Sequence, residues 1–311
     1  MMIKEAVKSN RLAYGETLVE LIKENPDVVV LDADACKSTG TICVKQQCPE
    51  NFIQCGIAEQ NMIGIACGMA YQDKIPFAAT FSVFASMRAV EQFRNSAAYV
   101  NANVKVCGTH SGLETGGDGG THMGIEDIAI MRAIPNVVVI APSTPINTSA
   151  MTRAMAEYVG PCYMRVGKDN APEIYEGTEQ FKIGGSYTCR EGKDLTIIAC
   201  GNMVWRSLEA AEKLDKEGID VRVIDMYSIK PIDKDAIVKA AQETNGIITV
   251  EDHNVMGGLG GAVAEVLCEM VPTKMLRVGL QDVFGRSGDA DKLYEMYHMT
   301  PDDIAEACRK I

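Results

Sequence analysis

The sequence lacks an excess of basic residues. Its 311 residues include 30 Lys and Arg against 42 Asp and Glu, which gives a formal net charge of −12. A nucleic-acid binder presents a basic face that neutralises phosphates, so this balance excludes a general nucleic-acid binder. Small anionic substrates remain compatible with the charge, provided that positive side chains gather in one pocket.

Long hydrophobic runs and paired cysteine motifs are also missing. No apolar stretch approaches the ~20 residues that a membrane-spanning helix needs, and the first residues lack the apolar core and cleavage site of a signal peptide. The eleven cysteines include no CxxC pair, which argues against a structural zinc site. These absences predict a reduced, cytoplasmic protein without a membrane segment.

Two blocks of alternating strands and helices run along the chain. Short apolar runs such as Val28–Leu31 and Val104–Cys107 predict buried strands, and the apolar spacing in Arg11–Lys23 and Glu59–Ala70 predicts helices. Strands that alternate with helices of this length are typical of parallel sheets covered on both faces. We therefore predict an α/β fold with two doubly wound, mostly parallel-sheet domains.

A charged stretch without periodicity, Lys168–Phe181, separates the two blocks. It contains Pro172 and Gly177, residues that interrupt regular structure. The predicted organisation is therefore a first domain over residues 1–170, a linker over residues 171–182 and a second domain over residues 183–311.

A glycine-rich loop follows the predicted strand Val104–Cys107. Residues 108–124 read GTHSGLETGGDGGTHMG, with seven glycines, His110, His122 and Asp118. Ligands of open parallel sheets bind beyond the carboxyl ends of strands, and glycine lets a backbone approach a ligand closely. The loop therefore predicts a ligand site, although a flexible surface loop is the alternative.

Glu59 begins a predicted helix whose following residues are apolar or small. A carboxylate is favourable at a helix N-terminus, but a helix that is apolar on every face is expected to be buried all round. Burial would favour the neutral form of the Glu59 carboxyl group unless a partner compensates, and a neutral carboxyl can share a proton with a ring nitrogen. Phe81, Phe84 and Met87 recur at a spacing of three nearby, a pattern that core residues also show.

The segments GIAEQNM, FAATFSVF and GTHSGLETGGDGGTH, in this order, resemble transketolase, specifically its pyrimidine-binding and C-terminal domains. The resemblance covers essentially the whole chain and is strongest from Arg11 to Arg165. It implies a thiamine diphosphate cofactor, whose aminopyrimidine ring would bind in an aromatic pocket that includes Phe81 and Phe84, with Asp34 near the cofactor. Met87 stands where the family commonly has a third aromatic residue.

The same resemblance implies roles for individual residues. Glu59 would hydrogen-bond the pyrimidine ring nitrogen and favour its imino tautomer, while His110 and His122 would bind oxygen atoms and move protons. Asp118 would bind a substrate hydroxyl group. The implied catalytic residues are Glu59, His110 and His122, and the implied substrate-binding residues are Arg11, Ser38, His110, Asp118, His122 and Arg165, with the arginines gripping a terminal anion.

Transketolases also have a domain that binds the cofactor's diphosphate through magnesium, and the sequence shows no such domain. The resemblance therefore implies the C-terminal subunit of a split transketolase, with the Mg²⁺ ligands on a separate N-terminal subunit and a heterotetramer formed by self-association of this chain. The reaction would move a two-carbon ketol unit from a ketose, bearing a phosphate or another anion such as a sulfonate, to an aldose.

Gly117-Asp118-Gly119 and Asn147 imitate the magnesium motif of thiamine-diphosphate enzymes. We do not predict a metal site from them, because Thr121-His122 follows the aspartate and Asn147 falls in a helix after a separate strand. No metal ligand is therefore expected in this chain.

Several alternatives remain at this point. The β subunit of a 2-oxoacid dehydrogenase has the same plan but lacks the two-histidine loop, and deoxyxylulose-phosphate synthase shares only the end of that loop. A noncatalytic partner is disfavoured by the joint presence of Glu59, His122 and Arg165. A nicotinamide-dependent dehydrogenase lacks its third glycine after Gly258-Leu259-Gly260. Glu251 and His253, placed near a subunit contact, are assigned no chemistry.

Overall fold

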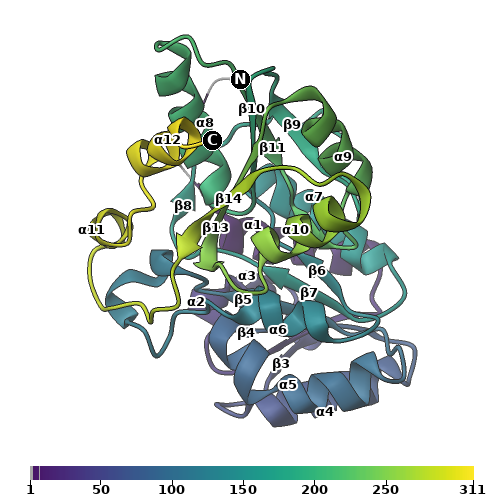
Figure 1. Ribbon diagram of the computed structural model, residues 1–311. Helices are drawn as coiled ribbons and strands as arrows, with labels where there is room; N and C mark the ends of the chain where they lie inside the picture. The colour runs from purple at the N-terminus through teal and green to yellow at the C-terminus, as the bar shows by residue number, and fades with distance from the viewer. Residues whose placement is uncertain (1–2, 7) are drawn as a thin grey trace.

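Two mostly parallel sheets, each with helices on both faces, form the framework of the chain (Figure 1). The computed structural model describes residues 3–6 and 8–311. The first sheet has the strand order β12-β6-β7-β5-β4-β2-β3 and the second the order β14-β13-β10-β11-β9. Only the edge strands β12 and β9 pair antiparallel with their neighbours in these two sheets. The prediction of two doubly wound α/β sheets is confirmed.

The strands are short apolar segments, as their burial on both faces requires. Those of the first sheet are β2 (Val28–Asp32), β3 (Phe52–Gln54), β4 (Ile75–Phe81), β5 (Lys105–Thr109), β6 (Val138–Ile140), β7 (Cys162–Arg165) and β12 (Ser228–Lys230). Those of the second are β9 (Tyr187–Arg190), β10 (Leu195–Ala199), β11 (Val221–Asp225), β13 (Ile247–Asn254) and β14 (Met275–Leu280). The strands β1 (Lys8–Ser9) and β8 (Asn170–Ala171) form a separate antiparallel pair.

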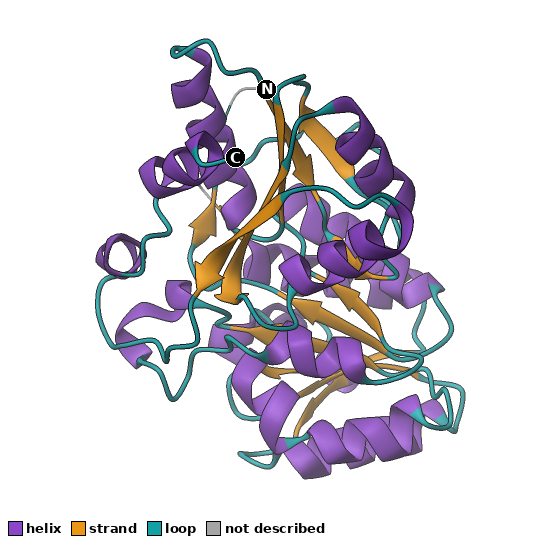
Figure 2. Cartoon of the chain, viewed as in Figure 1, coloured by secondary structure: helices purple, strands orange, loops and turns teal. Residues whose placement is uncertain are grey.

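Helices cover the first sheet on both faces (Figure 2). One face carries α1 (Asn10–Glu24), α3 (Ile42–Gln47) and α7 (Pro145–Glu157), and the other carries α4 (Glu59–Ala70), α6 (Asp127–Ala133) and the π-helical turns η2 (Phe84–Arg88) and η3 (Phe93–Ala98). Shorter pieces are α2 (Cys36–Thr39), η1 (Pro49–Asn51), α5 (Val90–Gln92) and the 3₁₀ segment η4 (Leu113–Asp118). None of the helices in the described residues is long and apolar enough to cross a membrane.

The second sheet is covered in the same way. The helices α8 (Met203–Asp215) and α12 (Pro301–Arg309) pack on one face, α9 (Lys234–Glu243) and α10 (Leu259–Met270) pack on the other, and α11 (Ala290–Met296) lies beside η4. The α10 helix begins against Glu251, whose two carboxylate oxygens accept hydrogen bonds from Leu259 N (2.7 Å) and Gly260 N (2.8 Å). A carboxylate at this end of a helix satisfies free amides and interacts favourably with the helix dipole.

The strand β12 was not predicted. Residues 228–230 follow the second-sheet strand β11, yet they pair antiparallel with β6 at the edge of the first sheet. The three-residue strand is too short to give a periodic sequence signal. Residues 228–230 lie in the predicted second domain but complete the sheet of the predicted first domain. The domain boundaries at residues 170 and 183 therefore stay a prediction.

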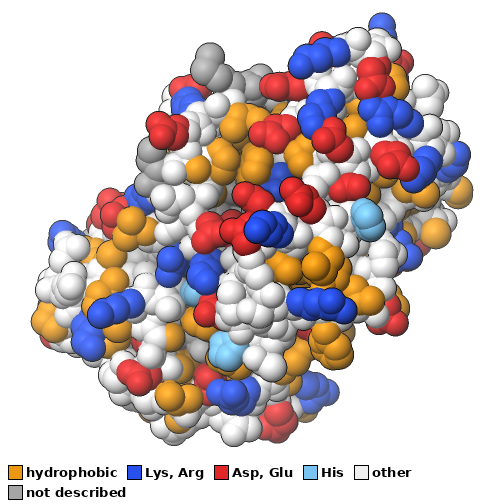
Figure 3. Space-filling view, turned by 90° about the vertical axis from the view of Figure 1, so that its left-hand side faces the viewer, with side chains coloured by type: hydrophobic (Ala, Val, Ile, Leu, Met, Phe, Trp, Pro, Cys, Tyr) orange, Lys and Arg blue, Asp and Glu red, His pale blue; other side chains and the backbone are white. Residues whose placement is uncertain are grey.

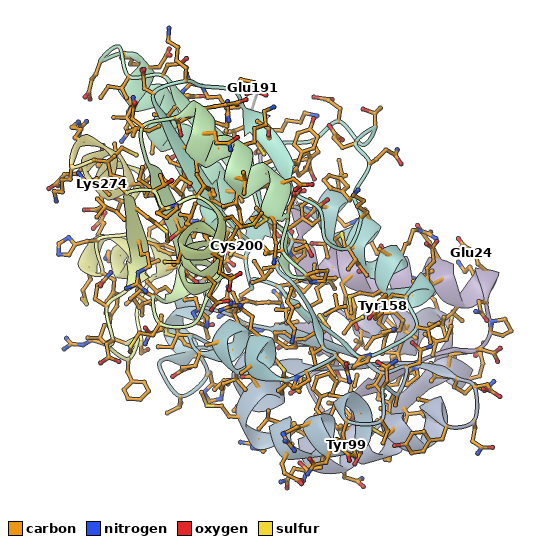
Figure 4. The ribbon with its side chains drawn as sticks, turned by 45° about the vertical axis from the view of Figure 1, so that its right-hand side comes forward. Glu24, Tyr99, Tyr158, Glu191, Cys200 and Lys274 are labelled. Atoms are coloured by element: carbon orange, nitrogen blue, oxygen red, sulfur yellow. The ribbon has the colours of Figure 1, made fainter. Side chains whose placement is uncertain are left out.

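Ionisable side chains are buried where the two sheets meet, the region that Cys200 marks in Figure 4. Arg165, at the end of β7, donates from Nε to Asp127 Oδ2 at 3.0 Å, and the two side chains are 4% and 0% exposed. Its Nη2 also donates to the backbone oxygens of Gly124 (3.0 Å) and Asp252 (2.6 Å). Because Asp252 belongs to β13, the hydrogen bond from Arg165 Nη2 joins the first sheet to the second.

His253 belongs to the same region and is fully buried within the chain, and its place near a subunit contact stays a prediction. Its Nε2 accepts a hydrogen bond from Ala129 N (3.4 Å), and its Nδ1 lies 2.6 Å from the backbone oxygen of Asn254. These contacts fit a neutral imidazole protonated on Nδ1. The side chain therefore links β13 to α6 within the chain.

The variant Asp127→Ala is expected to lower the free energy of unfolding by about 3–5 kcal/mol, because it leaves the Arg165 guanidinium buried without its counter-charge. The matched control is Arg153→Ala, which removes an exposed pair with Glu20 and Glu24 and should cost less than about 1 kcal/mol. Denaturant unfolding of both variants measures the difference. Equal losses would contradict the role assigned to the buried pair.

Candidate active site

Aromatic rings gather beyond the carboxyl ends of β4 and β5, the edge at which open parallel sheets bind ligands. Phe81, the last residue of β4, stacks on the His110 ring with 3.9 Å between centroids and 10° between planes. Phe81 also stacks on Phe84 at 5.7 Å, and the His122 ring meets Phe84 edge-on at 5.4 Å. The structure therefore brings both predicted aromatic residues and both predicted histidines into one cluster.

Glu59 lies at the first position of α4 and is 2% exposed. Its Oε1 accepts a hydrogen bond from Arg88 Nη1 at 2.7 Å. Its Oε2 is buried and has no hydrogen-bond partner among the described residues. An unsatisfied buried acceptor is costly, so this oxygen fits a ligand that brings a donor to it, such as a protonated ring nitrogen.

Arg88 is the compensating partner that the Glu59 carboxyl group was expected to need, and the sequence did not identify it. Its guanidinium lies 4.3 Å from the centre of the Phe84 ring, a cation–π distance. The π-helical turn of η2 brings Arg88 back over Phe84 and toward α4. Ordinary helical spacing does not reveal such a turn, which explains why the residue was missed.

Within the single chain, α4 is buried on one face and not on every side as expected. The core takes only the face with Met62, Ile63 and Ala66, while Gly64 and Gly68 are exposed. A Cβ atom built on either glycine meets nothing within 4 Å. The small residues of α4 therefore form an uncovered surface next to Glu59.

Positive charge collects on the other side of the cluster. Lys168 Nζ donates to Asp118 Oδ2 and to the backbone oxygen of Thr115, both at 3.0 Å. Arg11 donates from Nε to the Lys168 backbone oxygen (2.8 Å) and from Nη1 to the Ser38 backbone oxygen (3.0 Å). Arg11, Ser38, Asp118 and Lys168 thus lie together, on a molecule whose surface mixes basic, acidic and histidine side chains (Figure 3).

Lys168 was missed because it opens the charged stretch that the sequence suggested was a linker. The sequence predicted that Arg165 binds the substrate anion, and the structure corrects this prediction. The Arg165 side chain is buried, and its Nε and Nη2 donate to Asp127, Gly124 and Asp252. These contacts hold the guanidinium between the two sheets. The structure therefore does not support the anion-binding role expected for Arg165.

These charges act on the ionisation of the loop residues. Burial, together with the positive charges of Arg11 and Lys168, lowers the pKa of His110 to about 4. The hydrogen bond from Lys168 holds the pKa of Asp118 below its usual value. At neutral pH the site therefore presents a neutral His110 imidazole and an ionised Asp118.

Asp34 lies at the edge of the site. It is exposed, and its Oδ1 accepts a hydrogen bond from Gln54 Nε2 at 3.2 Å. Gln54 Oε1 in turn accepts a hydrogen bond from Gly56 N at 3.1 Å, three residues before Glu59.

Asn147, which in the sequence imitates a magnesium ligand, is buried in α7, where its Oδ1 accepts a hydrogen bond from Ser143 N. Within residues 3–6 and 8–311, no group of three His, Cys, Asp or Glu side chains could hold a metal ion.

Comparison with known families gives two matches that together span most of the chain. Residues 7–173 match the transketolase pyrimidine-binding domain, and residues 184–304 match the transketolase C-terminal domain. The expectation of transketolase rather than a 2-oxoacid dehydrogenase β subunit or deoxyxylulose-phosphate synthase is confirmed.

Individual proteins agree with these matches. A transketolase C-terminal section from Methanocaldococcus jannaschii is 48% identical over 302 residues, which are 96% of this chain and 95% of that protein. A 6-deoxy-6-sulfo-D-fructose transketolase subunit from a Clostridium species is 38% identical over 97% of this chain and 94% of its own length. A split-gene transketolase, solved as an inactive β4 tetramer, superimposes with a TM-score of 0.91 at 46% identity and covers 97% of both chains. This chain belongs to the transketolase family, as the C-terminal subunit of a split, thiamine-diphosphate-dependent transketolase.

Proposed function

We propose that this chain, assembled with a separate N-terminal subunit, transfers a two-carbon ketol unit from an anionic ketose to an aldose. The observation that carries the proposal is the unpartnered, buried Oε2 of Glu59, whose other oxygen Arg88 links to the stacked rings of Phe84 and Phe81. Glu59 Oε2 can accept a hydrogen bond from a ring nitrogen, and the faces of the Phe81 and Phe84 rings are flat and apolar. Both features suit the binding of an aminopyrimidine ring. Thiamine diphosphate, when bound, supplies the nucleophilic carbon and the electron sink of the reaction.

Glu59 would hold the pyrimidine ring in this arrangement. Its Oε2 would share a proton with the pyrimidine nitrogen, while Arg88 holds Oε1 at 2.7 Å. A carboxylate with one oxygen occupied keeps the other aimed in a single direction. Arg88 is therefore a positioning residue for Glu59, and Asp34 lies at the approach to the same helix.

The histidines and Asp118 act on the sugar. A neutral His110 imidazole can donate a hydrogen bond to one oxygen and accept a proton from another. His122 lies across the same aromatic cluster, where it binds the substrate carbonyl or hydroxyl oxygens. Asp118, ionised and fixed by Lys168, accepts a hydrogen bond from a substrate hydroxyl group and so contributes to stereochemical preference.

Arg11 and Lys168, with Ser38, form the binding site for the terminal anion of the sugar. Two cations at one end of a pocket select substrates with a negative terminus. The Clostridium relative is named for a sugar that carries a sulfo group at carbon 6, which supports an anion at this end and keeps sulfonate and phosphate both open.

The N-terminal subunit supplies the diphosphate and Mg²⁺ site. The names of the M. jannaschii section and of the split-gene structure support a separate subunit. Self-association through this chain, giving a heterotetramer, is supported by the uncovered glycines of α4 and by the tetramer of the related structure. The proposal includes a cytoplasmic location and domains over residues 1–170 and 183–311.

The function is tested by ketol transfer in the presence of Mg²⁺ and thiamine diphosphate. The assembled enzyme should transfer the unit, and this chain alone should not. In the assembled enzyme, Glu59→Gln should slow exchange of the thiazolium proton, followed by NMR, by about 100-fold or more, because an amide cannot share the proton. Glu50→Gln, at an exposed position, is the control. Exchange as fast in Glu59→Gln as in Glu50→Gln would remove Glu59 from the mechanism.

The ionisation of His110 gives a second prediction. Its imidazole NMR signals should stay constant between about pH 5.5 and 8, because the folded-state pKa is about 4. In the unfolded chain histidine binds a proton near pH 6.5, so the free energy of unfolding should fall as pH drops from about 6.5 towards 4. The variant His110→Asn assigns the signals and should weaken this pH dependence. A His110 signal that titrates near pH 6.5 would refute the prediction.

The anion site is tested by Lys168→Gln. Loss of a charge-assisted hydrogen bond should weaken the binding of an anionic ketose by about 1.5–3 kcal/mol, seen as a higher KM. Hydroxypyruvate is too short to reach this end of the pocket, so its donor reaction should change little. Lys182→Gln, at an exposed position outside the site, is the control. Equal losses for both donors would rule out the anion site.

A further inference from the structure

The glycine-rich loop, residues 108–124, is held by the second sheet and its connections. Leu113 N donates to Asp252 Oδ1 at 2.9 Å. Ser287 Oγ donates to the backbone oxygen of Gly117 at 2.7 Å. Two hydrogen bonds to the C-terminal domain therefore support the loop that carries His110, Asp118 and His122.

Asp252 is a rigid point of support. It is 1% exposed, and its Oδ2 accepts hydrogen bonds from Tyr294 Oη (2.6 Å) and Asn202 Nδ2 (3.1 Å). Its backbone oxygen accepts from Arg165. With both carboxylate oxygens occupied by three donors, the side chain has one orientation.

The loop backbone approaches this carboxylate closely. Gly112 has φ +70°, and a Cβ at this position would lie 2.2 Å from the carboxylate carbon of Asp252. No other residue fits there without displacing Asp252. Leu113, the residue held by Asp252, begins η4, and η4 ends at Asp118. The contact thus fixes the loop between His110 and Asp118.

The contact between Leu113 and Asp252 is linked to predicted site residues on both sides of it. Thr115 Oγ1 donates to the backbone oxygen of His110 at 2.7 Å, which ties η4 to the histidine. Lys168 holds Asp118 at the other end. A shift at Leu113 therefore moves groups that must match the substrate, and a displacement of about 1 Å can cost about 100-fold in rate.

We propose that Asp252 is a positioning residue through which the C-terminal domain holds the glycine-rich loop in its substrate-binding conformation, with Ser287 as a second support. The inference rests on the proposed function for the roles of His110, Asp118 and His122. On this inference the second sheet contributes to substrate recognition through Asp252, although the aromatic cluster of Phe81, Phe84, His110 and His122 consists of residues from the first sheet and its loops.

The test compares Asp252→Asn and Ser287→Ala with Asp235→Asn, which changes an exposed aspartate of the same domain. An amide offers one acceptor oxygen to the three donors around Asp252. In the assembled enzyme, amide hydrogen exchange over residues 111–124 should quicken about tenfold or more in Asp252→Asn and less in Ser287→Ala. The control should match the wild type.

Kinetics separate positioning from general loss of structure. In Asp252→Asn, kcat/KM for the ketose should fall by about 10- to 100-fold, while thiazolium proton exchange, which depends on Glu59, stays within about twofold. Loop exchange equal to that of Asp235→Asn, or a matching loss of thiazolium exchange, would overturn the proposal. If Asp252→Asn fails to fold, Ser287→Ala decides: its side chain is exposed, so unchanged loop exchange and kcat/KM there would also overturn it. Absence of ketol transfer by the wild-type enzyme would defeat the proposed function instead, and loop exchange would still report on Asp252.

Discussion

The structure depends on charges that are buried between its two sheets. The Arg165 and Asp127 side chains are almost fully buried, and a buried ion is tolerated only with a partner in good geometry. Tyr163 Oη adds a 2.7 Å hydrogen bond to Asp127, and β13 supplies the backbone oxygen that completes the set. Through these contacts Arg165 docks the second sheet on the first. The support that Asp252 gives to the glycine-rich loop follows from that docking.

Positive charge gathers at the candidate active site although the chain as a whole is negative. The chain carries a net charge of −12, so its surface as a whole repels anions. Arg11, Arg88 and Lys168 nevertheless converge around the aromatic cluster from three separate segments. Local charges of this kind, next to low-dielectric protein, determine where an anionic substrate binds even when the total charge is unfavourable. The same cations also contribute to keeping His110 neutral.

Much of the fold was accessible from the sequence, because apolar periodicity reports directly on burial. The predicted helix Arg11–Lys23 corresponds to α1, and Glu59 begins α4 as expected. The resemblance to transketolase placed Phe81, Phe84, His110 and His122 in one site, and the structure brings their rings together at the carboxyl ends of β4 and β5. Sequence could not distinguish Arg165 from Lys168. Arg165 shares a strand face with Tyr163 two residues earlier and so points to Asp127, whereas Lys168 follows the strand and turns to Asp118. Arg88 required a π-helical turn, and β12 required a long-range pairing, neither of which periodicity encodes.

The pairing of β12 with β6 has a consequence for how the two parts of the chain can be separated. Cutting the connection near residue 175 would not release a complete first domain, because its outer strand would leave with the other fragment. The exposed edge of β6 would then offer unpaired backbone groups to other chains, a template for edge-to-edge aggregation. Proteolytic dissection or the exchange of C-terminal domains between relatives must therefore carry residues 228–230 along with the first sheet, and a boundary drawn at the linker alone does not define two independent folding units.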